Sequence, residues 1–524
     1  MGSVEVRGVR YSVAGGTTLL DDASFRVGQG DHVALVGANG TGKTTLLRLI
    51  VGELRPEAGS IAIDGRALLL PQLVGGDDRT VRELMASLSP SSVRAAAVEL
   101  AAADVAATVE PADSTGMRLA RAHAAWADAG GYEAEVLWDV CATAALGCGF
   151  DDVADRRRAT LSGGEQKRLA LELLLRSDAD VLLLDEPDNF LDVPGKEWLE
   201  AELVACPRTI LFVSHDRELL AKVARKIVTI EGRGAWTHGG SFAEYHEARD
   251  ARLVRLDEEH KQFAEERKRL VASLREYRRR AQMGSDTFAS RVRATKHRIE
   301  RFDREPPPER PDTQTVSMRL GGDRTGKRVV MIEQLELSGL TDPFDAEIRF
   351  GERVGIVGFN GTGKSHFLRL LAGHDVEHTG HVALGARVVP GYFSQVHDRP
   401  DLADRTVLES LLAAGQARGE AMATLRRYEL RGCADQPFAT LSGGQQARLQ
   451  ILLVELSGAT VLLLDEPTDN LDLVSSEALE GALEQYGGTV IAVTHDRWLM
   501  RSFDRFLVFG SDCTVSESPE PLYR

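Results

Sequence analysis

Residues 32 to 50 read HVALVGANGTGKTTLLRLI, and this stretch decides the fold. The apolar run HVALV predicts a buried strand, and TLLRLI predicts a helix. Between them, Gly37 to Thr44 fit the pattern G-x-x-x-x-G-K-[ST], in the strand-loop-helix context that supports a phosphate-binding loop. The glycines let backbone N–H groups close around phosphates, and the helix N-terminus adds positive potential. We expect Lys43 to reach the β- and γ-phosphates and Thr44 to bind Mg²⁺, with further contacts from Gly37, Asn39, Gly40, Gly42 and Thr45.

The same sequence motifs recur later in the chain. GFNGTGKSH begins at Gly358, again after an apolar run, and supplies Gly358, Asn360, Gly361, Gly363, Lys364 and Ser365 for the same roles. LSGGEQKRLALELL (residues 161–174) returns as LSGGQQARLQILLV (residues 441–454). This second pair is offset by 280 residues, whereas the two loops are 321 apart. The chain is therefore one unit built twice, with an Ala-rich, helix-favouring insertion at about residues 90–135 of the first copy.

Two carboxylates end an apolar run in each copy. LLLDEPDNFLD (residues 182–192) returns as LLLDEPTDNLD (residues 462–472). A buried parallel strand reads as such a run, and its carboxyl end is where an α/β sheet places ligands. We expect Asp185 and Asp465 to help hold Mg²⁺. Glu186 and Glu466 are then placed to polarise the water that attacks the γ-phosphate.

The motifs LSGGEQ and LSGGQQ each stand at the start of a predicted apolar helix. Ser162, Gly163 and Gly164, and their counterparts Ser442, Gly443 and Gly444, could cap the helix and bind an anion there. Taken alone, such a stretch indicates only a helix N-cap. Its place about 20 residues before each acidic strand end favours a ligand-binding role.

Residues 246 to 305, between the two copies, predict a pair of long helices broken at MGSD and followed by PPPERP. Residues 261 to 304 contain 14 Lys and Arg against 6 Asp and Glu, a local net charge of +8 in a chain of net charge −16. This charge run indicates either a solvated helical spacer or a contact with nucleic acid.

Composition excludes several classes of protein. The 524 residues are 43% hydrophobic and 27% charged, which predicts two or three globular domains. No apolar stretch reaches the roughly 20 residues of a membrane helix, and the first residues lack an apolar secretory segment, so we expect a cytoplasmic protein without membrane insertion. The five cysteines form no C-x-x-C pair, which argues against a zinc site and a disulfide framework.

The order of phosphate loop, glutamine, L-S-G-G-Q-type signature, acidic strand end and histidine resembles the ATP-binding cassette family. The resemblance implies two cassettes docked head to tail, with each ATP held between one cassette's phosphate loop and the other's signature. Gln72 in LLLPQ and Gln395 in GYFSQ match the family's Q-loop glutamine, which also contacts Mg²⁺. His215 and His495 match its switch histidine, a γ-phosphate contact, and Tyr11 matches the aromatic that stacks on adenine.

The resemblance therefore implies two composite ATP sites. Site one would combine Lys43, Thr44, Gln72, Asp185, Glu186 and His215 with Ser442 and Gly444. Site two would combine Lys364, Ser365, Gln395, Asp465, Glu466 and His495 with Ser162 and Gly164. The second copy has no aromatic where the first has Tyr11, and we do not expect the nearby Phe344 to replace it.

Two cassettes in one chain, a basic helical hairpin between them and GGYEAEV before the first signature resemble the ABC-F proteins. This resemblance implies an ATP hydrolase that binds the ribosomal E site, contacts rRNA and directs its linker toward the P-site tRNA. It implies either a translation factor or an antibiotic-resistance protein. The usual motif D-E-P-T-N-H-L-D is altered here at Asp188, Phe190 and Asp469.

We therefore predict an α/β fold with two ATP-binding cassette domains, each a phosphate-loop core with a helical subdomain. They would span residues 1–245 and 316–524, joined by a basic helical hairpin over residues 246–315, and would pair within a monomer. One alternative is the ATPase subunit of a membrane transporter, whose membrane domain would be a separate chain. A DNA-repair ATPase of the same superfamily is disfavoured, because those proteins carry zinc-type cysteine clusters.

Overall fold

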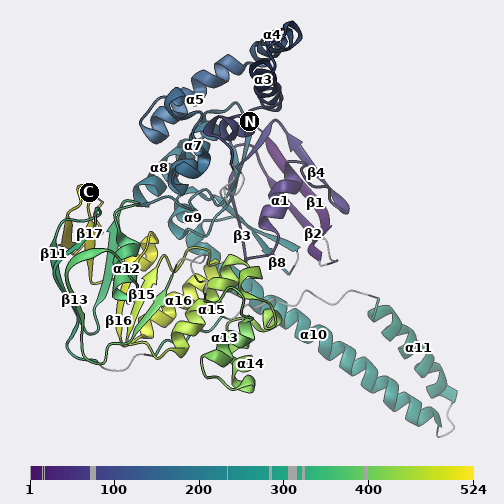
Figure 1. The fold of residues 1–524 in the computed structure, drawn as a ribbon. Helices are drawn as coiled ribbons and strands as arrows, with labels where there is room; N and C mark the ends of the chain where they lie inside the picture. The colour runs from purple at the N-terminus through teal and green to yellow at the C-terminus, as the bar shows by residue number, and fades with distance from the viewer. Residues whose placement is uncertain are drawn as a thin grey trace.

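A computed structural model describes residues 2–13, 16, 18–70, 78–232, 234–282, 286–304, 316–321, 325–394, 399 and 401–523 (Figure 1). It contains the same arrangement of sheets twice. The first cassette has a six-stranded sheet of order β5-β6-β7-β3-β8-β9 and a three-stranded sheet of order β2-β1-β4. The second has β14-β15-β16-β12-β17-β18 and β11-β10-β13. The predicted fold class, two α/β cassettes, is confirmed.

The six-stranded sheets are parallel except for one antiparallel edge strand. The strands of the first cassette are β1 (Ser3–Ser12), β2 (Thr18–Val27), β3 (His32–Gly37), β4 (Ala58–Asp64), β5 (Ala67–Leu70), β6 (Val181–Asp185), β7 (Thr209–Val213), β8 (Lys226–Glu231) and β9 (Gly234–His238). Those of the second are β10 (Arg328–Leu337), β11 (Phe344–Arg349), β12 (Arg353–Gly358), β13 (His378–Leu384), β14 (Pro390–Phe393), β15 (Val461–Asp465), β16 (Thr489–Val493), β17 (Arg505–Phe509) and β18 (Val515–Ser518).

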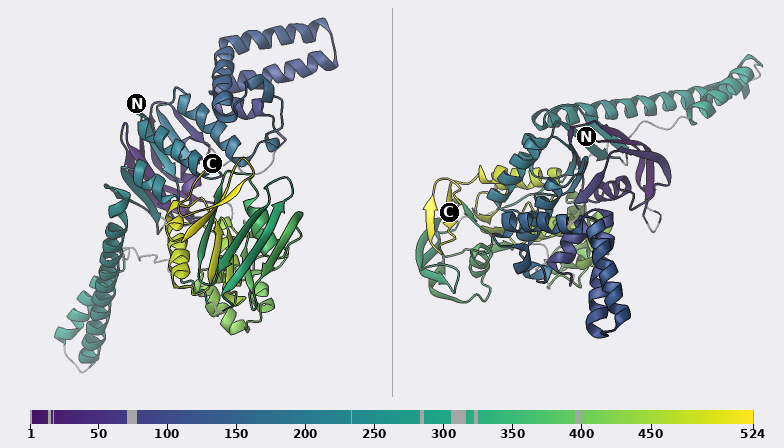
Figure 2. Two further views of the ribbon diagram at one scale, coloured as in Figure 1. Left: turned by 90° about the vertical axis from the view of Figure 1, so that its left-hand side faces the viewer. Right: turned by 90° about the horizontal axis from the view of Figure 1, so that it is seen from above.

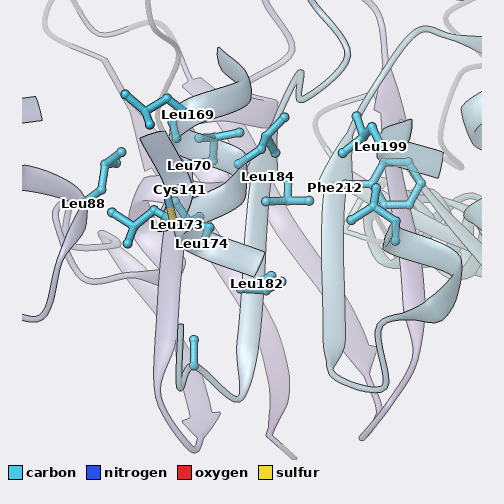
Figure 3. Close-up of a cluster of buried hydrophobic side chains, with 14 of the residues drawn as sticks. Leu70, Leu88, Cys141, Leu169, Leu173, Leu174, Leu182, Leu184, Leu199 and Phe212 are labelled. Atoms are coloured by element: carbon cyan, nitrogen blue, oxygen red, sulfur yellow. The ribbon is translucent and has the colours of Figure 1, made fainter. Parts of the chain in front are cut away.

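The central strands form because their residues are apolar on both faces. Every residue of β6 and β7 is buried, as expected for parallel strands covered by helices on both sides. Figure 3 shows Leu182 and Leu184 of β6 between Leu169, Leu173 and the neighbouring side chains of the first core. Asp185 is the first polar residue after this run, so the sheet itself brings its carboxylate to the carboxyl edge.

Each cassette has a helical part beside its sheets. In the first these helices are α2 (Val81–Leu88), α3 (Ser91–Val109), α4 (Asp113–Asp128), α5 (Gly131–Leu146), α6 (Phe150–Val153) and α7 (Gly163–Arg176). In the second they are α13 (Val407–Ala413), α14 (Arg418–Arg427) and α15 (Gly443–Leu456). The Ala-rich insertion is the projecting pair α3 and α4 (Figure 2). The remaining cassette helices are α1 (Lys43–Ile50), α8 (Val193–Ala205), α9 (Arg217–Val223), α12 (Lys364–Leu371), α16 (Leu473–Gln485) and α17 (Arg497–Met500).

The segment between the cassettes is a helical hairpin that extends away from both (Figures 1 and 2). Helix α10 (Phe242–Gln282) runs outward and α11 (Asp286–Phe302) returns along it. Phe263 stacks on Phe302 with ring centroids 4.4 Å apart, and Arg267 pairs with Asp303 at 2.9 Å. These contacts hold the two helices together outside any globular core. Among the helices of the described residues, none is long and apolar enough to cross a membrane.

Candidate active sites between the two cassettes

The two phosphate loops have the same backbone geometry. Gly42 precedes α1 and Gly363 precedes α12, each with φ of 96°, a left-handed conformation that glycine adopts at little cost. Lys43 Nζ donates to the carbonyl oxygen of Gly37 at 2.7 Å, and Lys364 Nζ donates to that of Gly358 at 2.9 Å. Both ammonium groups therefore lie inside their loops, where a bound phosphate would meet them.

The acidic strand ends lie beside the hydroxyl groups that follow these lysines. Ser365 Oγ donates to Asp465 Oδ1 at 3.0 Å, and the Thr44 hydroxyl lies close enough to Asp185 to oppose the rise in its pKa. Burial, with help from Glu186, raises the pKa of Asp185 to about 6. Its Oδ1 atom is buried and has no hydrogen-bond partner among the described residues. A hydroxyl beside a buried carboxylate with an unsatisfied oxygen fits Mg²⁺, which prefers oxygen ligands.

The two glutamates share a backbone conformation but differ in their partners. Glu186 and Glu466 both have φ of 47°, an uncommon value for a residue other than glycine. Glu186 accepts a 2.7 Å hydrogen bond from the Asn189 side chain. Glu466 accepts one of 3.0 Å from the His495 backbone N–H, and burial, Asp469 and Asp465 raise its pKa to about 8. The two sites are therefore not chemically identical.

The histidines line the same cavity as the glutamates, and His495 Nε2 lies 3.3 Å from Glu466 Oε1. Neither ring nitrogen of His215 has a partner among the described residues, and Nδ1 of His495 has none either. Burial lowers the pKa of His215 to about 3, with a further contribution from Lys43. Burial likewise lowers the pKa of His495 well below its usual value. A lowered pKa favours the neutral imidazole, which leaves both ring nitrogens of His215 and the Nδ1 atom of His495 for a hydrogen bond to a ligand.

The signature of each cassette faces the phosphate loop of the other. Asn39 in the first loop donates to the main-chain oxygen of Asn470 at 2.7 Å, and Asn360 in the second donates to that of Phe190 at 3.3 Å. A Cβ atom on Gly444 would lie 2.4 Å from the Asn39 amide nitrogen. Ser162 and Ser442 cap α7 and α15, as the plain N-cap interpretation expected, and the same helix N-termini point into the interface.

A cavity of about 650 Å³ lies between the cassettes. The predicted site residues that line it are Asn39, Gly40, Gly42, Lys43, Thr44, Thr45, Ser162, Gly163, Gly164, Glu186, His215, Asn360, Ser442, Gly443, Gly444, Glu466 and His495. The other predicted residues do not line it: Gly361 and Gly363 lie in the second loop, Gly37, Gly358, Asp185 and Asp465 end strands, and Lys364 and Ser365 begin α12. Gln72 and Gln395 fall outside the described residues. Both cassettes thus line one shared cavity, as a head-to-tail pair requires.

The two sites differ in the residues at the position where adenine would bind. Tyr11, on β1, packs half-buried at the edge of the first cassette's core. Gly8 on β1 and Gln334 on β10 both have positive φ, 59° and 47°, and aligning the strands on this feature puts Leu337 at the place of Tyr11. Leu337 is fully buried. Phe344 is also buried, against Phe367 and Phe509, so it offers no ring to a base.

Sequence reasoning missed a set of charged residues at the interface. Arg217 follows His215-Asp216 and binds Glu480 and Asp496 of the second cassette. Arg497 makes the mirrored pairs, with Glu200 and Asp216 of the first. Each residue and its counterpart are 280 positions apart. The constant offset of 280 residues could have identified these residues as equivalent in the two copies. It does not reveal that each arginine pairs with acids of the other copy.

The hairpin presents its positive charge to solvent. Arg278, Arg279, Arg280, Arg291 and Arg293 are exposed near its outer end. Arg280 pairs with Glu276 at 2.5 Å, whereas Arg278, Arg279 and Arg293 have no acidic partner within 4 Å among the described side chains. Unpaired surface arginines on a projecting element are typical of phosphate contacts.

Comparison with known proteins agrees with this geometry. The family model described as ABC transporter matches residues 20–189 and 341–469. An "Antibiotic resistance protein" of Mycobacteroides abscessus is 50% identical, with 100% of both chains covered. "ABC transporter F family member 5" of Arabidopsis thaliana is 31% identical over 95% of this chain and 73% of its own. A solved chain from "Model of ribosome-bound archaeal Pelota and ABCE1" shares the fold, with a TM-score of 0.55, 21% identity, and coverage of 99% of this chain and 77% of that one.

Proposed function

The chain belongs to the ABC-F family of ATP-binding cassette ATPases, and on this premise we propose that ATP hydrolysis controls its binding to the ribosome through the basic hairpin. The observation that carries the proposal is the exposed, partly unpaired arginine cluster at the outer end of α10 and α11. A chain of net charge −16 that concentrates positive charge on one projection is suited to a local RNA contact rather than to coating nucleic acid.

The root of the hairpin gives the cassettes a means of moving it. Tyr245 on α10 hydrogen-bonds Thr229 at 3.0 Å, which fastens the helix to the first cassette. His246 lies 3.5 Å from Glu477 of the second cassette. The first turns of α10 contact both cassettes, so a change in the relative position of the cassettes changes the direction of this helix of 41 residues.

Within each site the side chains divide the work of hydrolysis. Lys43 and Lys364 hold the β- and γ-phosphates, and Tyr11 stacks on adenine in site one. Glu186 and Glu466 orient the attacking water, because each lies at the strand end nearest the γ-phosphate position, and Glu466, whose pKa is raised to about 8, must lose its proton before it can polarise that water. The neutral imidazoles of His215 and His495 contact the γ-phosphate. The facing signatures, Ser442 to Gly444 and Ser162 to Gly164, close the opposite side of each nucleotide.

Mg²⁺, when bound, offsets the negative charge of the β- and γ-phosphates. Thr44 with Asp185, and Ser365 with Asp465, would hold it, together with Gln72 and Gln395. Hydrolysis removes the group that joins each phosphate loop to the facing signature, so it releases the closed pair. The closed state is then the ATP-bound state that docks the hairpin.

The proposed target is the ribosomal E site, with the hairpin on rRNA and directed at the P-site tRNA. The name of the M. abscessus relative, which matches over the full length of both chains, supports protection from ribosome-targeting antibiotics over general modulation of translation. The interface between the cassettes is within one chain, which supports a monomer. Such a target also implies a cytoplasmic protein.

A variant that binds but does not hydrolyse ATP tests the proposal. Glu186→Gln with Glu466→Gln keeps the shape of both strand ends and can hydrogen-bond a water, but is a poor proton acceptor. We expect this variant to sediment with ribosomes in ATP but not in ADP, and to slow translation in vitro. The matched control adds Lys43→Ala and Lys364→Ala, which should abolish both effects.

Sedimentation with membranes instead of ribosomes, without detergent and with ATP, would favour the transporter alternative. A variant that binds ATP but neither sediments with ribosomes nor slows translation would contradict the proposal while leaving the ATPase assignment intact.

A further inference from the structure

Lys196 is a largely buried cation at the cassette interface that the hydrolytic machinery does not use. It lies in the first turn of α8, directly after the first acidic motif, and its side chain is 11% exposed. Its counterpart 280 residues later is Ser476, which carries no charge. A buried ammonium is strongly unfavourable unless charged partners surround it, so its neighbours define its role.

The hydrogen bonds of Lys196 reach both ATP sites. Its Nζ donates to Asp216 Oδ2 at 3.0 Å, on the turn that follows His215 of site one. The same Nζ donates across the interface to the carbonyl oxygen of His495, the histidine of site two, at 3.4 Å. One side chain therefore contacts the histidine turns of both sites.

Two further carboxylates supply the charge that balances this group. Asp188 and Asp469 line the same cavity as Lys196, one from each cassette. Burial raises the pKa of each to about 6, and the Lys196 ammonium opposes that rise. Burial would lower the pKa of Lys196, but Asp216, Asp188 and Asp469 together raise it. Lys196 is therefore charged at neutral pH.

The sequence shows that these acids belong to the same arrangement. Asp188 corresponds to Thr468 in the other copy, and Asp469 corresponds to Asn189. Each cassette thus has one acid where its counterpart is neutral. They are two of the four positions at which the chain departs from the D-E-P-T-N-H-L-D motif, the others being Phe190 and Asn470. Lys196 accounts for both departures, because it lines the same cavity and its charge balances both carboxylates.

We propose that Lys196 is a positioning residue for both ATP sites. Its ammonium, balanced by Asp188 and Asp469, fixes the turn after His215 and the backbone of His495 when the cassettes close. It touches no reacting atom and acts through those two histidine turns. Because one group serves both turns, its loss impairs both sites together. The inference concerns ATP hydrolysis and does not depend on the ribosomal target.

Lys196→Met tests the proposal, since it keeps the side-chain length and removes the charge. Turnover is measured in the full chain with one site silenced at a time: Glu466→Gln leaves site one, and Glu186→Gln leaves site two. We expect kcat to fall about tenfold or more at both sites, because buried carboxylates lose their counter-charge. The Kd for ATP should change less than about threefold, since the phosphate-loop lysines are untouched.

A fall in kcat of less than about threefold at either site, in a variant with unchanged thermal unfolding, would overturn the proposal. So would a loss confined to one site. A matched control is Arg501→Ala, which removes a cross-cassette ion pair with Glu218 at the exposed rim. Exposed pairs contribute little, so this variant should stay within about twofold of the parent at both sites. An equal loss in Arg501→Ala would show that any cross-cassette pair has the effect.

A second variant tests the counter-charges and covers the case in which Lys196→Met does not fold. Asp188→Thr and Asp469→Asn copy the neutral residues of the opposite cassette, while Asp216 keeps Arg497 at 3.5 Å. The triple variant with Lys196→Met should fold and turn over ATP at least about threefold faster than Lys196→Met alone, because Asp188 and Asp469 no longer leave buried carboxylates without a counter-charge, while the two hydrogen bonds of Lys196 stay lost. A triple variant as impaired as Lys196→Met, or one that fails to fold, would overturn the assignment of the two acids.

Discussion

The side-chain amide of Asn39 donates a 2.7 Å hydrogen bond to the main-chain oxygen of Asn470 in the other cassette. The backbone N–H of Asn39 also donates to Asp472 of that cassette at 3.2 Å. Asn360 makes the mirrored contact with Phe190. Each phosphate loop is thus completed by the loop after the other cassette's acidic strand end. Closure and assembly of the sites are one event.

Asn39→Ala should weaken site one more than site two. It removes a hydrogen bond worth about 1 kcal/mol and leaves a carbonyl oxygen without its donor, which corresponds to roughly fivefold in turnover. The measurement is steady-state ATPase activity in the Glu466→Gln background, which reports site one. Asn360→Ala is the matched control and should act mainly on site two, in the Glu186→Gln background. Equal losses at both sites for either variant would contradict the assignment of each asparagine to one site.

Lys43→Ala and Lys364→Ala should each weaken ATP binding at their own site. Each ammonium lies inside its loop, and a charge-assisted hydrogen bond contributes about 1.5–3 kcal/mol, or roughly 10- to 100-fold in Kd. Titration with ATP under non-hydrolysing conditions checks this. Lys226→Ala, which removes a half-exposed ion pair with Asp31 away from both sites, is the control. Near-normal affinity in the double lysine variant would contradict the phosphate-loop assignment.

Site two should bind ATP more weakly than site one. Site one has Tyr11, whereas the matching position in the second cassette is the buried Leu337. Stacking of an aromatic on a base is worth about 1–3 kcal/mol and acts on any base, so the Kd values of the two sites should differ by roughly tenfold. Titration with ATP in Lys364→Ala reports site one, and titration in Lys43→Ala reports site two. Tyr11→Leu should raise the Kd of site one to about that of site two; an unchanged Kd in that variant would exclude a stacking role.

Replacing Arg278, Arg279, Arg280, Arg291 and Arg293 with Ala should lower ribosome affinity and flatten its dependence on salt. For every arginine that binds a phosphate, its removal should reduce the slope of log K against log salt by about 0.7–0.9. ATP turnover without ribosomes should be unchanged, because these residues lie far outside the cavity. The control is the same five positions changed to Lys, which keeps the charge and should keep most of the slope. Identical binding of the Ala variant across the salt series would make the hairpin a spacer.

Much of what each cassette contributes to the two sites was predictable, because those residues lie in short, contiguous sequence motifs. The strand before Gly37, the helix after Lys43 and the acidic end of β6 all follow from local burial and backbone conformation. The order of these motifs along the chain indicated the family. The predictions for Gln72 and Gln395 stay predictions, since both lie outside the described residues.

The sequence by itself determined that the chain is one cassette built twice, with a basic helical hairpin between the copies, because these features depend on local patterns and on their constant spacing. Only the tertiary structure decided which side chains meet across the interface. Lys196 contacts His495, and Arg217 binds Glu480, although each pair is separated by more than 260 residues. No local propensity encodes such contacts. They arise because two folded surfaces meet and bury their charges, and buried charges must then find partners of opposite sign wherever the chain happens to bring them.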